Sequence, residues 1–232
     1  MVGVFERRLQ AHSAEHFPTH WRVIGATQME QVVQFGIRRA LESGYPGKRD
    51  GYMFHSLMLQ FGSYFDTDPQ YPWLAKALLD DTMGSRSERL ASAYDAAIDY
   101  LDKVAGAQGE HMRAALQRLR LTVMPELREA PRGHFDYLLN LLDVTWPQKL
   151  AVMGGQTLRS LAESVIPIAK ANGLTTFGGA GLYTIACFIF GHGLQRDPQF
   201  PWARQSLSLG LSGEPARKAF AQSLEAQLSA LD

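Results

Sequence analysis

The feature that most constrains this chain is an internal repeat: residues 17–103 align with residues 146–232 at a constant offset of 129 positions, without a gap. The match is strongest where FGSYFDTDPQYPW (61–73) meets FGHGLQRDPQFPW (190–202), with seven of 13 positions identical. Glycine and proline also coincide at Pro18/Pro147, Gly25/Gly154, Gly44/Gly173 and Gly84/Gly213. Because these residue types fix backbone geometry, their shared register indicates shared structure. We therefore interpret the chain as a tandem duplication.

The hydrophobic pattern predicts helices nearly throughout. Apolar residues recur every three or four positions, as in residues 29–41, and no stretch alternates with a period of two. We expect an all-α fold in which two units of four or five helices pack about a pseudo-two-fold axis. Residues 104–145 belong to neither copy and are expected to form a helical connection, interrupted at Pro125 and Pro131. The prediction is a single helical domain over residues 1–232.

Composition excludes several classes of function. Lys plus Arg equals Asp plus Glu at 23 each, so no net charge favours nucleic acid or an anionic membrane. The most apolar run, residues 182–190, is about half as long as the ~20 residues of a membrane helix. A single cysteine, Cys187, allows no internal disulfide, and residues 1–8 lack the order of a signal peptide. We expect a cytoplasmic protein with neither nucleic-acid binding nor membrane insertion.

The duplicated Asp-Pro-Gln-aromatic-Pro-Trp motif is most simply a folding element. Asp68 and Asp197 suit the N-cap of a short helix, and the proline after each suits its first turn. Trp73 and Trp202 are expected to be largely buried behind the motif. The alternative is that its aromatic residues, including Tyr71, Trp73 and Trp202, line a binding surface.

Two patterns resemble metal sites. Residues 12–16 match the His-x-x-Glu-His spacing of a zinc-binding helix, with His20 nearby, but Pro18 ends that helix almost at once. Residues 66–68 form a pair of carboxylates, but no strand precedes them and the second copy has Gln195 in place of the first aspartate. We therefore predict no metal, no cofactor and no catalytic residue.

The clearest local divergence between the copies follows the shared Phe-Gly. Residues 63–67 carry aromatic and acidic side chains, whereas the equivalent positions carry His192 and Arg196. Arginine can engage a carboxylate through a bidentate fork, and a protonated histidine adds a second donor. We predict that His192 and Arg196 contact an acidic partner or ligand, with Trp202 as a supporting wall. The alternative is a divergent helix cap.

The run FGHGLQRDPQFPW (190–202), on a helical chain of this size, resembles bacterial proteins found in type VI secretion and effector–immunity settings. The resemblance covers the two 13-residue segments and implies an intracellular protein-interaction module: a secretion-system accessory, an effector chaperone or an immunity protein. It transfers no catalytic residues. A second reading is a helical enzyme or small-ligand-binding protein with a cleft between the two halves. A third is a homodimer formed through an exposed apolar face.

Overall fold

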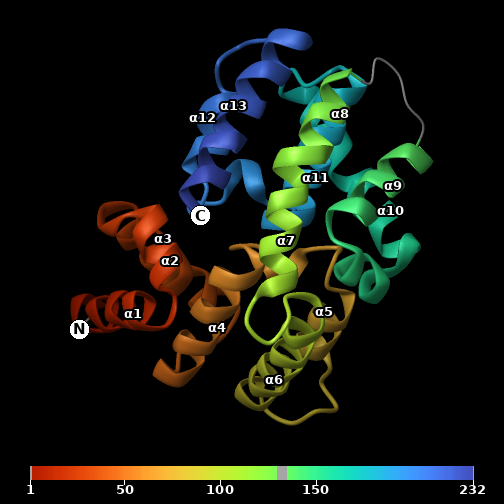
Figure 1. The fold of residues 1–232 in the computed structure, drawn as a ribbon. Helices are drawn as coiled ribbons and strands as arrows, with labels where there is room; N and C mark the ends of the chain where they lie inside the picture. The colour runs from red at the N-terminus through yellow and green to blue at the C-terminus, as the bar shows by residue number, and fades with distance from the viewer. Residues whose placement is uncertain (1, 130–134, 232) are drawn as a thin grey trace.

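The computed structural model describes residues 2–129 and 135–231, and this part of the chain contains helices and no strand (Figure 1). The predicted all-α class is therefore confirmed. In chain order the elements are α1 (Val2–His16), α2 (Pro18–Ile24), α3 (Ala26–Glu42), α4 (Lys48–Phe61), η1 (Phe65–Thr67), α5 (Pro72–Leu79), α6 (Arg86–Val104), α7 (Glu110–Arg118), η2 (Leu119–Val123), α8 (Met124–Glu129), α9 (Phe135–Thr145), α10 (Pro147–Ala171), α11 (Phe177–Phe190), η3 (Leu194–Arg196), α12 (Pro201–Leu207) and α13 (Glu214–Leu231).

The helices of residues 17–103, the N-terminal segment, follow the same order as those of residues 146–232, the C-terminal segment. Both limits of α4 lie 129 residues before those of α11, and both limits of η1 lie 129 residues before those of η3. Gly25, between α2 and α3, has a φ of 79°, and Gly154, at a kink inside α10, has a φ of 77°. Helix contacts correspond as well: α3 packs on α4 and α5 on α6, while α10 packs on α11 and α12 on α13.

The connection between the segments contains α7, η2, α8 and α9, of which η2 and α8 run on from α7 without a loop. The expected interruption at Pro125 takes a milder form: the helix continues through this proline, which has no N–H to donate to the turn before it. The π-helical turn η2 directly precedes it and widens the helix there. Pro131 lies outside the described residues.

The core is one connected cluster of side chains from both segments and the connection. Helix α11 lies at its centre: every residue from 178 to 188 is buried, and the helix contacts α8, α10 and α13. Its uniformly apolar sequence predicts this position, since a helix that is hydrophobic on all faces needs neighbours on all faces. The helix ends at Phe190, because Gly191 adopts a φ of 101°.

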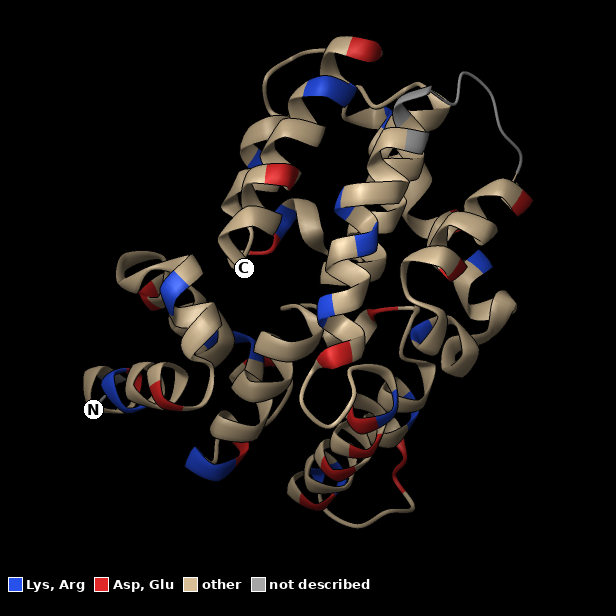
Figure 2. Ribbon diagram, in the orientation of Figure 1, with Lys and Arg blue, Asp and Glu red and all other residues tan. Residues whose placement is uncertain are grey.

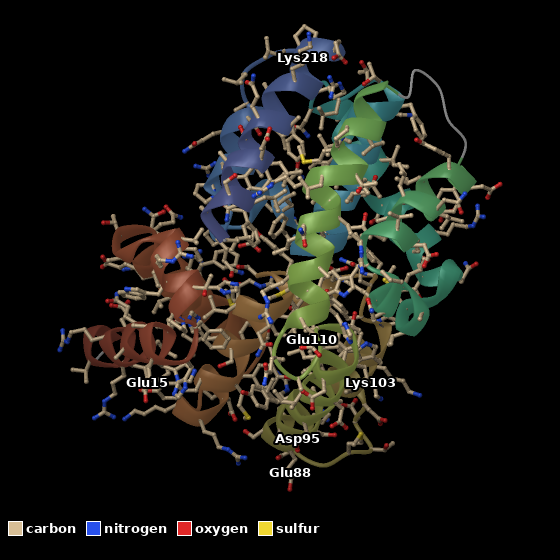
Figure 3. The ribbon with its side chains drawn as sticks, in the orientation of Figure 1. Glu15, Glu88, Asp95, Lys103, Glu110 and Lys218 are labelled. Atoms are coloured by element: carbon tan, nitrogen blue, oxygen red, sulfur yellow. The ribbon has the colours of Figure 1, made fainter. Side chains whose placement is uncertain are left out.

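Charged residues of both signs are spread over the helices (Figure 2). Helix α6 carries acidic and basic side chains, with Glu88 and Asp95 projecting outward (Figure 3), and Arg113 and Arg118 lie along α7. None of the helices in the described part of the chain is both long and apolar enough to span a membrane.

Candidate functional site at the paired Asp-Pro turns

Each Asp-Pro motif forms a tight turn between two helices. Asp68 follows η1 and accepts the backbone N–H of Gln70 at 2.9 Å, and Asp197 follows η3 and accepts that of Gln199 at 2.9 Å. The expected N-cap role of the two aspartates is wrong. The helices begin at the second proline of each motif, and the preceding aromatic residue occupies the N-cap without a side-chain hydrogen bond. The aspartates bond two residues ahead, in the manner of an Asx turn.

The carboxylate of each aspartate also joins the two segments. Asp197 accepts the backbone N–H and the hydroxyl of Ser63, at 2.6 and 2.7 Å, and Asp68 accepts the backbone N–H of His192 at 2.8 Å. Ser63 and His192 are equivalent positions in the alignment, so each turn holds the same point of the other segment. Both carboxylates are at least 96% buried, and buried carboxylates require such donors.

The two glutamines of the motifs also cross between segments. The side-chain amide of Gln70 donates to the carbonyl of Cys187 at 3.0 Å, and that of Gln199 donates to the carbonyl of Met58 at 2.8 Å. These carbonyls lie in the last turns of α11 and α4, and that of Cys187 also accepts the backbone N–H of Gly191 at 2.9 Å. These hydrogen bonds explain why the aspartate and the glutamine are identical in the two motifs.

The Phe-Gly pairs are fixed by close backbone contact. A β-carbon on Gly62 would lie 2.7 Å from the carbonyl oxygen of Phe190, and one on Gly191 would lie 2.8 Å from that of Phe61. Both glycines also have positive φ, at 89° and 101°. Any other residue would push the ends of α4 and α11 apart.

A buried lysine adjoins this junction. Lys149, in the first turn of α10, is 2% exposed, and its Nζ donates to the Tyr71 hydroxyl at 3.1 Å and to the carbonyl of Phe188. Its Nζ also lies 4.7 Å from the centre of the Phe188 ring. Burial lowers the pKa of Lys149 to about 7, although the nearby Asp68 charge opposes this shift. Burial likewise raises the pKa of Asp197, against the hydrogen bonds from Ser63.

Of the residues predicted to bind a partner, the aromatic ones lie in two separate clusters. Tyr71 is buried at 3% exposure, and Trp73 is partly buried with its ring 5.4 Å from that of Tyr100. Trp202 is partly buried in the other segment, 5.6 Å from Phe220. The expectation that both tryptophans are largely buried is thus met only in part.

His192 and Arg196 do come together, through Tyr64 of the other segment. The guanidinium carbon of Arg196 lies 4.1 Å from the centre of the Tyr64 ring, and the His192 ring meets the same ring edge-on at 6.4 Å. Arg196 is exposed, whereas the His192 side chain is 13% exposed and its Nδ1 lies 3.3 Å from a carboxylate oxygen of Asp68. Arg196 is therefore the outward-facing member of this pair.

Three further side chains from α3 extend the surface around Tyr64. Arg39 lies over the Tyr64 ring at 5.0 Å, Phe35 packs edge-on against that ring at 5.6 Å, and Arg38 lies over Phe35 at 5.3 Å. We call these five residues, Phe35, Arg38, Arg39, Tyr64 and Arg196, the Arg–aromatic patch. Of these five residues, only Arg196 was predicted from the sequence. A usable signal was present, because Phe35, Arg38 and Arg39 have the i, i+3, i+4 spacing of one helix face.

The patch carries a net positive charge. Arg39 is neutralised by Asp66, because its Nη2 donates to both carboxylate oxygens. Arg38 and Arg196 are exposed and form no ion pair with any carboxylate in residues 2–129 and 135–231. Two guanidinium groups held over aromatic rings therefore remain available to an acidic group.

The comparisons with known proteins identify no relative. No family model matches the chain, and neither the curated proteins nor the solved structures contain a significant match. Within the described part of the chain, no three His, Cys, Asp or Glu side chains are grouped as metal ligands would be.

Proposed function

We propose that this chain is an intracellular protein-interaction module that binds an acidic segment of another protein through the Arg–aromatic patch. The proposal rests on the exposure and the contacts of Arg38 and Arg196. Both are exposed, both lie over aromatic rings, and neither has a carboxylate partner among the described residues. An arginine in this state has its hydrogen-bond donors free for an acidic group.

Stacking makes these arginines suited to binding. A guanidinium held over a ring has already lost part of its rotational freedom, so less entropy is lost when it pairs with a carboxylate. Arginine and tyrosine are also enriched among the residues that dominate protein–protein affinity. Tyr64 supplies the ring for Arg196, and His192 supports that ring from the inner side.

We further propose that the scaffold is a tandem duplication, with the two segments related by a pseudo-two-fold axis within one domain. The support is that hydrogen bonds between the two segments occur in pairs at aligned positions. Asp68 bonds to His192 as Asp197 bonds to Ser63, and Gln70 and Gln199 likewise exchange equivalent partners. The helix contacts show the same relation: α2 contacts α13, and the aligned pair, α10 and α6, are also in contact.

Within this function, the resemblance to type VI secretion and effector–immunity proteins favours a bacterial secretion accessory, effector chaperone or immunity protein. The alternative, an enzyme or ligand-binding protein with a cleft between the halves, has less support. Tyr71 and Phe200 would line that cleft but are buried in packing contacts. A cytoplasmic location remains part of the proposal, and a homodimer formed through an exposed apolar face is a third alternative.

The test is affinity capture from the native host with quantitative mass spectrometry, comparing the wild type with the Arg38→Ala/Arg196→Ala double variant. The matched control is Arg22→Ala/Arg204→Ala, which removes two exposed arginines elsewhere. We expect at least one protein with an acidic segment to be captured by the wild type and the control and lost from the patch variant. Its dissociation constant should rise about tenfold or more in the patch variant, as removing a charged hydrogen-bond donor typically does.

Melting curves of the three proteins should agree within a few degrees, because both patch arginines are exposed. If the patch variant retains the same partners at the same affinity, the patch is not the binding surface and the proposal is wrong. If the control loses the partner equally, binding depends on net charge and not on this site.

A further inference from the structure

A second site lies entirely within the N-terminal segment. A pocket of about 420 Å³ opens between the end of α3, helix α5 and the first turns of α6. This volume falls in the range of small-molecule sites. The pocket is distinct from the Arg–aromatic patch, and the two share no residue.

A buried arginine forms one wall of this pocket. Arg89 is 8% exposed, and all its hydrogen bonds within the described chain are made by one nitrogen, Nη1. Nη1 contacts the carbonyls of Asp80 and Gly84 and lies 3.0 Å from a carboxylate oxygen of Asp81. Its Nε is buried without a partner. Nε and Nη2 lie on the same edge of the guanidinium, and together they can donate two parallel hydrogen bonds to one carboxylate. We call this edge the fork of Arg89, and it is vacant.

Two more donors stand around the same pocket. The guanidinium of Arg86 is held at the end of α3, where Nη1 donates to the carbonyl of Ser43 at 3.3 Å. Gly44 makes this placement possible, because a β-carbon there would lie 1.7 Å from that nitrogen. Tyr45 is 5% exposed, and both Arg86 and Arg89 are close enough to oppose the upward shift that burial causes in its pKa.

The rest of the lining is apolar, from Phe54 of α4 and from Ala75 and Leu78 of α5. Two carboxylates also line the pocket, and neither cancels the arginines. Asp66 is engaged by Arg39, and the Asp81 side chain is 93% exposed, so water screens its pairing with Arg89.

We propose that this pocket binds a small carboxylate that carries an apolar body, with the carboxylate on Arg89, Arg86 and Tyr45 and the body against Phe54, Ala75 and Leu78. The carboxylate would satisfy the vacant fork of Arg89, which is otherwise a buried donor group without a partner. The apolar part would cover the wall formed by α4 and α5. A free acid and the C-terminal residue of a peptide share this chemistry.

Isothermal titration calorimetry with the full chain tests the proposal, using octanoate, octanol, acetate and N-acetyl-L-leucine as probes. Octanoate or N-acetyl-L-leucine should bind saturably at one site, about tenfold tighter than octanol, which lacks the carboxylate, and than acetate, which lacks the body. Tighter binding of N-acetyl-L-leucine identifies a peptide terminus as the source, and tighter binding of octanoate a free acid.

Variants locate the site. Arg86→Gln changes an exposed side chain and should keep the fold, and Arg89→Lys retains the charge but removes the fork. Each should weaken binding about tenfold or more, whereas Arg204→Gln should bind like the wild type. Absence of saturable binding to either acid, equal binding of octanol, or wild-type affinity in both Arg86→Gln and Arg89→Lys would each overturn the proposal.

Discussion

Replacing Lys149 with methionine should change how the stability of this protein depends on pH. The ammonium of Lys149 is removed from water and surrounded by Tyr71, Trp146 and Phe188. Its Nζ donates two hydrogen bonds, one to the Tyr71 hydroxyl and one to the carbonyl of Phe188. Burial lowers its pKa from 10.5 to about 7, because the charged form loses more hydration than these contacts return.

The sign of the effect follows from proton binding. Between pH 7 and 10.5 the lysine is protonated in the unfolded chain and largely neutral in the folded protein. The unfolded state therefore binds more protons, and the free energy of unfolding rises with pH in this window. Integrating the two titrations from about pH 7 to about pH 9.5 gives a gain of ~3 kcal/mol from Lys149 alone. Below pH 7 both states are protonated and this contribution levels off.

The measurement is urea unfolding followed by circular dichroism, at several pH values from about 6 to about 9.5, for the wild type and Lys149→Met. The upper limit matters because burial also raises the pKa of Tyr71, whose folded form would begin to lose stability at higher pH. The variant removes two hydrogen bonds, which shifts its whole curve, but the difference between the curves should grow by ~3 kcal/mol across the window. Parallel curves would mean that Lys149 titrates normally and is not buried as described, and a difference of opposite sign would refute the argument outright.

Three further outcomes test the junction between the segments. Gly191→Ala should lower the free energy of unfolding by about 3 kcal/mol or more in denaturant melts, because it combines a φ of 101° with a β-carbon 2.8 Å from a carbonyl oxygen. The control, Gly155→Ala, changes an exposed helical position with open space around it and should be neutral or slightly stabilising. Equal effects of the two substitutions would exclude the close contact. Asp197→Asn should cost about 2–4 kcal/mol, since the amide turns a donor toward the groups that now donate to the carboxylate, and a loss below about 1 kcal/mol would mean the carboxylate is not buried. In a double-mutant cycle, Asp197→Asn and Ser63→Ala should couple by about 1 kcal/mol or more, and additive losses would show that the two side chains do not interact.

The helices were predictable from the sequence because their causes are local. Helical periodicity marks α3, and Gly44 marks its end; the uniformly apolar sequence of α11 marks the centre of the core. The role of the aspartates was not predictable in this way. Rules for capping consider only the next turn of chain, whereas Asp68 binds the backbone of His192, 124 residues further along. A local rule can place such a side chain at a turn but cannot identify its distant acceptor or donor.

The candidate site also contains features that the sequence predicts and features that it does not. Arg196 was predictable because it replaces Thr67 of the aligned copy, and the spacing of Phe35, Arg38 and Arg39 was visible on one face of α3. The contact between them was not, because it depends on Tyr64 lying between the two segments. Only the close approach of the C-terminal ends of α4 and α11, at Gly62 and Gly191, brings that ring under an arginine from the other segment.

The divergence between the aligned motifs therefore has two different causes. Tyr64 and Gly193 are equivalent positions, and a β-carbon on Gly193 would lie 2.3 Å from the Tyr64 ring. Under the proposed two-fold relation these positions face each other, so only one of them can carry a large side chain, and their difference is a requirement of packing. Arg196 is exposed and meets no such requirement. Packing accounts for the glycine but not for the arginine, and the arginine is therefore the difference that points to binding.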